Sequence, residues 1–277
     1  MLLRRFVLPI LCLASPAAPA HQTYIISDAD VMQPGTLNFL TVRNGTFHES
    51  VNSITHQMTR DIAVIQRGQR TAPTAEEVFD ADDTASYKAS YIKVAAGQPG
   101  TALAGVATQA KVIGFPAEMY ADYLRREGLV DALEALKGNE LSTVRERYTK
   151  HAKAIFQIGD SVSQDYSYKL GYRAEIFLER HPAELKPGDD AVFRVMLDDK
   201  PLPNQIVYIV QNSKQVPTSA GGAAGAVYTL RTDHSGKAAF KITGKDRWAI
   251  QMIHIQKATD SAADYESNYS TLTFDVR

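Results

Sequence analysis

The chain has 277 residues, 44% of them hydrophobic and 22% charged, with 30 basic against 31 acidic side chains. This even balance, without any basic run, excludes a nucleic-acid-binding protein, which needs a concentrated cationic face. The single cysteine lies in a segment that we expect to be removed, which excludes thiol catalysis, cysteine zinc sites and redox motifs.

Residues 1–20 have the features of a cleaved secretion signal. Two arginines precede an apolar run, and the segment ends in "APA", the A-x-A pattern after which signal peptidase cuts. The run is shorter than the roughly 20 residues that span a bilayer, and no later segment is apolar enough to do so. We therefore expect a periplasmic protein that begins at His21 and has no transmembrane segment after signal removal.

Residues 21–115 are predicted to form an N-terminal β-sandwich module. The runs "HQTYIISD", "TLNFLTVRNG", "DIAVIQRG" and "SYKASYIKVAAG" are rich in β-branched and aromatic residues, and turn residues separate them. A further run, "TALAGVATQAKVIGF", contains alanines that favour a helix, but its end alternates as a strand does. We interpret it as a strand.

Residues 116–160 are predicted to form a helical insertion. Pro116 suits the first turn of a helix, and "PAEMYADYLRREGLVDALEALKG" has apolar residues at helical spacing. Gly128 is expected to divide this stretch into two helices. Thr143 and Glu146 match a capping box, which predicts a third helix.

Residues 174–277 are predicted to form a C-terminal β-sandwich module. Seven short strand-like runs occur in about 100 residues, with turns such as "KPGD" and "DHSG" between them. The expected fold class is therefore mainly β, with two β-sandwich modules, Ig-like or transthyretin-like, and a short helical insertion.

His21 is the first candidate for a metal site. As a first residue it would offer its α-amine and one imidazole nitrogen, and nitrogen ligands suit copper, nickel and cobalt. The alternative is that His21 has no role, since signal peptidase specifies the residues before the cut and leaves the next one open.

His254 is the candidate second ligand. Strand periodicity places it on one face with Trp248, Ile250 and Met252, so its imidazole would be rigidly held. A histidine on an apolar face is equally explained as a core residue with one hydrogen-bond partner.

Asp264 and Glu266 are two apart, so in an extended segment both carboxylates point the same way. They could bind a metal or orient a ligating histidine, or they could be two solvated charges. His48 and His56, on a polar segment, and His151 are weaker candidates.

The sequence contains none of the catalytic motifs that we considered. It lacks a nucleophile elbow, a His-Glu-x-x-His helix, a Walker loop and a dinucleotide fingerprint. One enzyme hypothesis stays open, because copper polysaccharide monooxygenases also hold their metal with an N-terminal histidine on a β-sandwich. His254 and a tyrosine could complete such a site, but the rest of that family's pattern is missing. We predict a protein that is not an enzyme.

Several segments resemble the DUF4198 family of exported bacterial proteins. They are "VRNGTFHESVNSI", "RERYTKHAKAIFQIGD", "ERHPAELKPGDDAVFRVMLDDKPLPNQIVYIV", "TDHSGKAAFKIT" and "RWAIQMIHI" followed by "DYESNYSTLTFDVR". The resemblance implies an exported, β-rich, non-catalytic protein. It also implies a link to nickel or cobalt uptake, because some relatives are associated with it as components beside a membrane transporter.

From the residues and the resemblance together we predict a periplasmic binding protein for a divalent transition metal. The metal would be nickel or cobalt, with copper second, and the expected ligands are His21, His254, Asp264 and Glu266. The partner would be a membrane metal transporter or another envelope protein. The alternative function is a structural or protein-interaction module that binds no metal.

Overall fold

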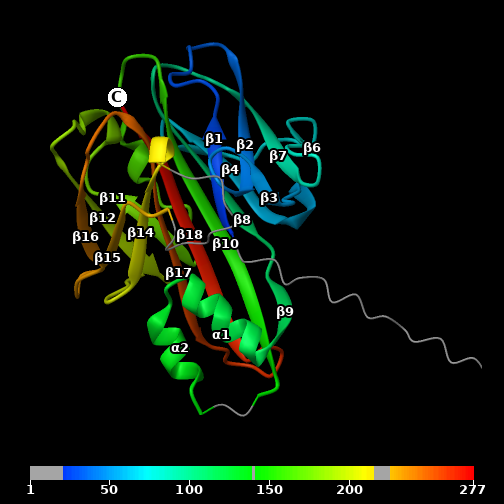
Figure 1. Cartoon of the computed structure of the whole chain (residues 1–277). Helices are drawn as coiled ribbons and strands as arrows, with labels where there is room; N and C mark the ends of the chain where they lie inside the picture. The colour runs from blue at the N-terminus through cyan, green and yellow to red at the C-terminus, as the bar shows by residue number, and fades with distance from the viewer. Residues whose placement is uncertain (1–20, 139–140, 215–224) are drawn as a thin grey trace, which may run out of the picture.

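The computed structural model describes residues 21–138, 141–214 and 225–277 (Figure 1). The predicted secretion signal, residues 1–20, lies outside the described residues. Within the described part, the chain forms three β-sheets and two short α-helices. The mainly β fold class predicted from the sequence is confirmed.

A five-stranded antiparallel sheet, sheet A, belongs entirely to the N-terminal part. Its strands are β1 (Gln22–Ser27), β2 (Leu37–Gly45), β3 (Ser50–Asn52), β6 (Val78–Asp82) and β7 (Lys88–Ala95). They pair in the order β1-β2-β7-β6, and β3 pairs with β2. Along β7, the buried Ile92 and Val94 alternate with the half-buried Tyr91 and Lys93, as expected when one face of a sheet is covered.

A nine-stranded sheet, sheet B, runs through the whole molecule. Its strands are β4 (Thr59–Gln66), β5 (Gln69–Thr71), β8 (Gly100–Thr108), β9 (Lys111–Pro116), β10 (Thr143–Ile158), β14 (Ile206–Gln211), β15 (Tyr228–Arg231), β17 (Asp246–Lys257) and β18 (Tyr265–Val276). The order is β15-β14-β17-β18-β10-β8-β4-β5, and β9 pairs with β10. The long strands β10 and β18 pair in parallel at its centre.

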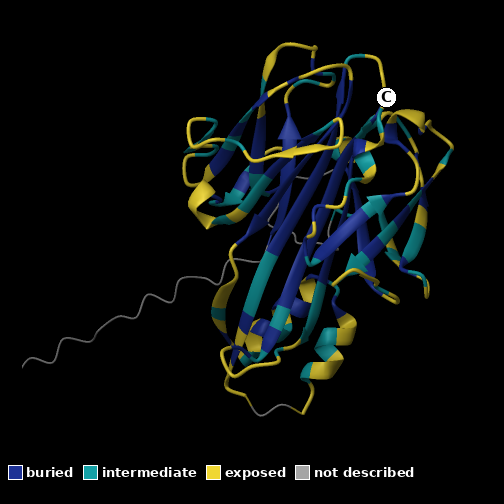
Figure 2. Ribbon diagram, turned by 180° about the vertical axis from the view of Figure 1, so that it is seen from behind, coloured by how far each residue is buried: buried dark blue, intermediate teal, exposed yellow. Residues whose placement is uncertain are grey.

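Sheet C belongs to the C-terminal part. It contains β11 (Ala174–Leu178), β12 (Asp190–Leu197), β13 (Lys200–Pro201) and β16 (Lys237–Lys241). Sheets A and C cover opposite faces of sheet B. Strand β8 shows the result, because Ala104 and Val106 face the core under sheet A while Leu103 and Ala107 face the core under sheet C. The central strands are accordingly buried along most of their length (Figure 2).

The predicted modules 21–115 and 174–277 therefore each supply a small sheet and also contribute strands to the shared sheet B. Gly105 on β8 shows how closely the parts approach, because a Cβ there would overlap the side chain of Leu170. The bounds of the two modules stay predictions.

The two helices predicted on either side of Gly128 are present, and they cover one end of sheet B. Helix α1 (Ala117–Arg126) begins directly after Pro116, and α2 (Val130–Leu136) follows Gly128, whose φ of 68° interrupts the helix. Tyr120, Tyr123 and Leu124 are buried against the ends of β9, β10, β17 and β18 (Figure 1).

The predicted third helix is wrong. Thr143 and Glu146 lie in the 16-residue strand β10 and form no capping box. Val144, Glu146 and Lys150 are buried, at even spacing, and β9 and β18 satisfy the backbone from either side. Tertiary pairing overrides the local signal here. Among the described residues of the predicted insertion 116–160, α-helix occurs only within residues 117–136.

Candidate functional site

A cavity of about 430 Å³ opens beside β10, between the N-terminal module and the turn that joins β8 to β9. Its wall combines polar, aromatic and aliphatic side chains. The lining residues are Asn44, Asn52, Ser53, Ile54, Gln57, Met58, Thr108, Gln109, Ala110, Lys111, Ile113, Phe115, Glu146, Tyr148, Lys150 and Tyr269. We call this space the β10 cavity.

Glu146 is a buried carboxyl in the wall of the β10 cavity. The Ser267 hydroxyl donates to its Oε1, whereas Oε2 has no hydrogen-bond partner among the described residues. Burial raises the pKa of Glu146 to about 7, against the opposing effects of the Ser267, Tyr120 and Tyr269 hydroxyls and of the Lys150 charge. A buried oxygen without a partner carries a desolvation cost that a bound donor would remove.

Lys150 lies two strand positions beyond Tyr148, on the same face of β10 as Glu146. Its Nζ donates to the main-chain oxygen of His21 at 2.5 Å and to Asn44 Oδ1 at 2.7 Å. Nζ also lies 5.4 Å from the centre of the Tyr269 ring. Burial lowers the pKa of Lys150 to about 7, although nearby carboxylates oppose the shift.

Aromatic rings form the end of the β10 cavity nearest the helices. Phe115, Tyr148 and Tyr269 line it, and Tyr123 from α1 pairs its hydroxyl with that of Tyr269. Burial raises the pKa of both hydroxyls, so they stay protonated. Helix α1 thus fixes one of the rings that face the cavity.

His21 is buried at the start of β1, and its main chain contacts Lys150. Burial, followed by the Lys150 charge, lowers the pKa of the His21 imidazole to about 4. The ring is therefore neutral at pH 7, which is the form that binds metals.

His254 lies on the opposite face of sheet B. It pairs with Asn268, whereas Lys150 pairs with Tyr269, and consecutive residues of β18 point to opposite faces. Its Nδ1 is 2.9 Å from Gln205 Oε1, and burial lowers its pKa. The structure does not bring His254 to His21, because sheet B lies between them. The predicted row with Trp248, Ile250 and Met252 is confirmed, since those three side chains lie in the core under sheet C.

Asp264 and Glu266 are engaged with arginines. Asp264 accepts from Arg145 through its main-chain N–H at 2.7 Å and its guanidinium at 2.9 Å, and these hydrogen bonds lower its pKa. Glu266 is 2.6 Å from Arg173 and 3.3 Å from Arg147; burial raises its pKa, but the arginines outweigh burial and the net shift is downward. Neither carboxylate joins His21.

The described residues contain no group of three or more His, Cys, Asp or Glu side chains arranged to hold a metal ion. The predicted four-residue set is dispersed over both faces of sheet B. Of its members, His21 alone lies against the wall of the β10 cavity, through its contact with Lys150.

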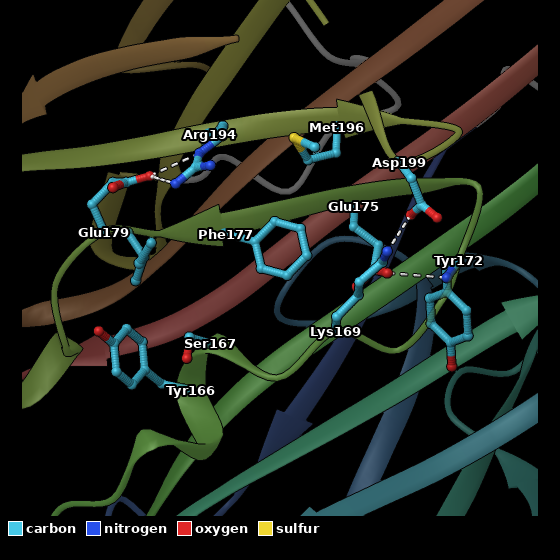
Figure 3. Close-up of a pocket in the computed structure, with 11 residues that line it drawn as sticks. Tyr166, Ser167, Lys169, Tyr172, Glu175, Phe177, Glu179, Arg194, Met196 and Asp199 are labelled. Carbon is cyan, nitrogen blue, oxygen red and sulfur yellow. Dashed lines mark hydrogen bonds and ion pairs between the residues drawn. The ribbon is translucent and has the colours of Figure 1, made fainter. Parts of the chain in front are cut away.

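A second cavity, of about 350 Å³, lies beside β11 and β12 (Figure 3). Its polar groups are matched. Arg194 reaches Glu179 at 2.5 Å on one side, and Lys169 reaches Asp199 at 2.6 Å on the other (Figure 3). The residues that line it are Tyr166, Ser167, Lys169, Tyr172, Glu175, Phe177, Leu178, Glu179, Arg194, Met196 and Asp199.

Glu175, in the wall of this second cavity, is buried and fully bonded. Lys153 Nζ lies 2.9 Å from its Oε2, and the main-chain N–H groups of Leu170, Gly171 and Tyr172 donate to its two oxygens. A carboxylate held in this way has a structural role, because it joins the 170–172 turn to β10.

Sequence reasoning missed Lys150 and assigned Glu146 to a helix cap. The available signal was the alternation of Glu146, Tyr148 and Lys150, which places two charges and a ring on one strand face. That signal is readable only once residues 143–158 are known to be a strand.

Comparisons with known proteins give the family and distant structural likenesses. The D0-D1 domain of intimin is 13% identical, with 91% of this chain and 97% of that chain covered and a TM-score of 0.21. A Salmonella alpha-2-macroglobulin reacted with methylamine is 9% identical, with a TM-score of 0.23; the match covers 92% of this chain but only 15% of the macroglobulin. Mouse nectin-like molecule 4 is 7% identical over 92% of this chain and 64% of its own ectodomain chain, with a TM-score of 0.19.

No curated protein is significantly similar to the chain. Across the described residues, neither helix has the length and apolar character needed to cross a membrane. The family resemblance inferred from the sequence is confirmed by a family model that matches residues 18–256. The chain belongs to the family described as "Domain of unknown function (DUF4198)".

Proposed function

We propose that this protein is a non-catalytic binding protein of the cell envelope, and that the β10 cavity holds a small ligand. The observation that carries the proposal is Glu146 Oε2, a buried carboxyl oxygen without a partner in the wall of a cavity large enough for an organic molecule. Leaving such a group unsatisfied costs about 1–3 kcal/mol. A ligand that donates to Oε2 would offset that cost.

A test of cavity binding uses one variant that fills the space. Ala110→Trp places a bulky ring at the cavity wall, on an exposed turn outside the polar cluster. Ala75→Trp, at an exposed site on another loop, is the matched control. We expect members of a library of small polar metabolites to raise the melting temperature of the wild type and of Ala75→Trp, but not of Ala110→Trp.

The same experiment separates binding from turnover and from the alternative function. A carboxyl and an amine with pKa values near 7 are also what general acid–base catalysis uses. Binding alone requires that the ligand is recovered chemically unchanged after incubation. If no library member binds, the structural or protein-interaction module becomes the better interpretation.

Nickel or cobalt binding at His21 is the second candidate function. The observation that favours it is the neutral His21 imidazole, next to the α-amine that signal cleavage would create. On this proposal the protein would pass the metal to a membrane transporter. His254, Asp264 and Glu266 are not part of the proposed site, because they lie apart from His21 in the fold.

Calorimetry tests the metal candidate directly. We expect mature protein beginning at His21 to bind nickel or cobalt one to one, and to bind it more weakly with one extra alanine before His21. His254→Ala should bind as the wild type does, since it lies on the other face of sheet B. Equal binding by the processed and extended forms would contradict the metal proposal. Intact-mass measurement of periplasmic protein checks the start at His21.

A further inference from the structure

We propose that the ligand of the β10 cavity is a small zwitterion with an ammonium group at one end and a carboxylate at the other. The inference rests on the proposed binding function and names its ligand class. In the complex, the ligand ammonium lies against Glu146 and the ligand carboxylate lies against Lys150.

The Glu146 end of the cavity suits an ammonium group. Ser267 donates to Oε1, whereas Oε2 accepts no hydrogen bond within the described residues. The Tyr120 and Tyr269 hydroxyls lie close enough to lower the pKa of Glu146, so a ligand N–H would compete with them for Oε2. Phe115, Tyr148 and Tyr269 line the same cavity, and aromatic faces attract a cation. A carboxylate beside aromatic rings is an arrangement that binds an amine.

The Lys150 end suits a carboxylate. Its ammonium has three N–H donors, and His21 O and Asn44 Oδ1 accept two of them at 2.5 and 2.7 Å. These bonds fix Nζ in place and leave one donor for a ligand oxygen. Glu127 and Glu146 act on Lys150 electrostatically, but no ion pair of its Nζ occurs in the described part of the chain, and a ligand carboxylate would supply one.

The charge of the lining excludes simpler ligands. Among the lining residues Lys111 and Lys150 are basic and Glu146 is acidic, so a ligand with only a positive charge meets two cations. A ligand with only a negative charge leaves Glu146 Oε2 without a donor. A zwitterion satisfies both ends.

The strand sets the spacing of the two ligand charges. Glu146 and Lys150 are four residues apart on one face of β10, so their Cα atoms are about 13 Å apart. The ammonium and carboxylate of an α-amino acid are separated by a single carbon, which is short compared with this spacing. The spacing favours an ω-amino acid or a short peptide.

Three ligands of one length test the proposal without any mutation. Calorimetry would compare 6-aminohexanoate with hexylamine, which lacks the carboxylate, and hexanoate, which lacks the amine. We expect 6-aminohexanoate to bind at least about tenfold more tightly than either, and more tightly than glycine. If hexylamine or hexanoate binds as tightly as 6-aminohexanoate, the proposal is overturned.

Two substitutions test which residue binds each charged group of the ligand. Glu146→Gln should abolish the preference for 6-aminohexanoate over hexanoate, and Lys150→Met should abolish the preference over hexylamine. Glu118→Gln and Lys257→Met, both exposed, are the matched controls and should keep both preferences. If Glu146→Gln and Lys150→Met keep both preferences, or if each loses the preference expected of the other, the assignment of Glu146 to the ammonium and Lys150 to the carboxylate is overturned. If Lys150→Met does not fold, Lys150→Arg keeps the charge and should keep the preference.

Failure of the zwitterion proposal is distinguishable from failure of the binding function. If neither 6-aminohexanoate nor dialanine binds, but a library ligand does and is lost in Ala110→Trp, the ligand class is wrong and the binding function stands. If no compound binds, the zwitterion proposal and the proposed binding function are both wrong.

Discussion

Strand β10 carries two buried lysines to opposite faces of the central sheet, and their surroundings differ. Lys153 faces sheet C and pairs with Glu175, whose oxygens also accept three main-chain N–H groups. Lys150 faces the β10 cavity, and within the described residues it forms no ion pair with the nearby Glu146. Lys153 and Glu175 form an ion pair within the fold, whereas Lys150 and Glu146 do not.

The difference shows how a buried charge that stabilises the fold can be distinguished from one that is available to a ligand. Burying two charges is costly, and the cost is recovered only when geometry and additional hydrogen bonds satisfy them. The fold meets that condition at Glu175 and does not meet it at Glu146. An unmet condition beside a cavity is best explained by a molecule that binds there.

The largest change in stability is expected at the buried ion pair of Lys153 and Glu175. Glu175→Gln leaves Lys153 as a buried, uncompensated cation, which should lower the free energy of unfolding by about 3–5 kcal/mol. Urea denaturation measures the loss. Adding Lys153→Met should recover much of it, because no unpaired charge remains; if the double variant is less stable than the single one, the two faces do not differ as described.

Glu146→Gln should act in the opposite direction and depend on pH. The folded-state pKa of about 7 exceeds the ordinary value of 4.5, so wild-type stability falls as pH rises from 4.5 through 7. The variant lacks this fall and should be about 3 kcal/mol more stable than the wild type at pH 8.5, but equally stable below pH 4.5. Parallel pH profiles from urea denaturation would contradict the prediction.

Lys150→Met should loosen one strand more than the whole protein. It removes the donor to the main-chain oxygen of His21, a hydrogen bond worth about 1 kcal/mol. We expect amide hydrogens of β1 to exchange about fivefold faster, with little change in β12. Hydrogen exchange with mass spectrometry measures this, with Lys257→Met as control. Uniform acceleration in both strands would show a global effect instead.

Asp264→Asn should have the smallest effect. The Arg145–Asp264 pair lies at the surface, and such pairs contribute about 0–1 kcal/mol. The loss should shrink further in high salt, and nickel binding should not change. A loss of nickel binding in this variant would restore Asp264 to the metal site.

The strands were predictable because one-sided burial leaves an alternating pattern, and the helices because Pro116 and Gly128 mark where they begin and break. Strand β10 was not predictable from local sequence. Its partners on one edge are β8 and β9, but on the other edge its partner is β18, more than 100 residues later. Its charged residues match a helix pattern until those partners are known.

The candidate site was less predictable than the fold. Alternation correctly placed His254 in a row with Trp248, Ile250 and Met252. Alternation gives only relative faces within a strand, however, and cannot say which face another strand will cover. That β1 lies over the Lys150 side of sheet B, away from His254, is a property of the tertiary arrangement.

The parallel pairing of β10 with β18 has a consequence for how the protein is made. If the chain is exported N-terminus first, β10 emerges long before residues 265–276 can join it. During that interval one edge of a 16-residue strand has unpaired N–H and C=O groups, which is the template on which chains aggregate. Contacts between residues so far apart in sequence also form slowly. In that case the emerging chain should need protection by a chaperone until its last strand completes the sheet.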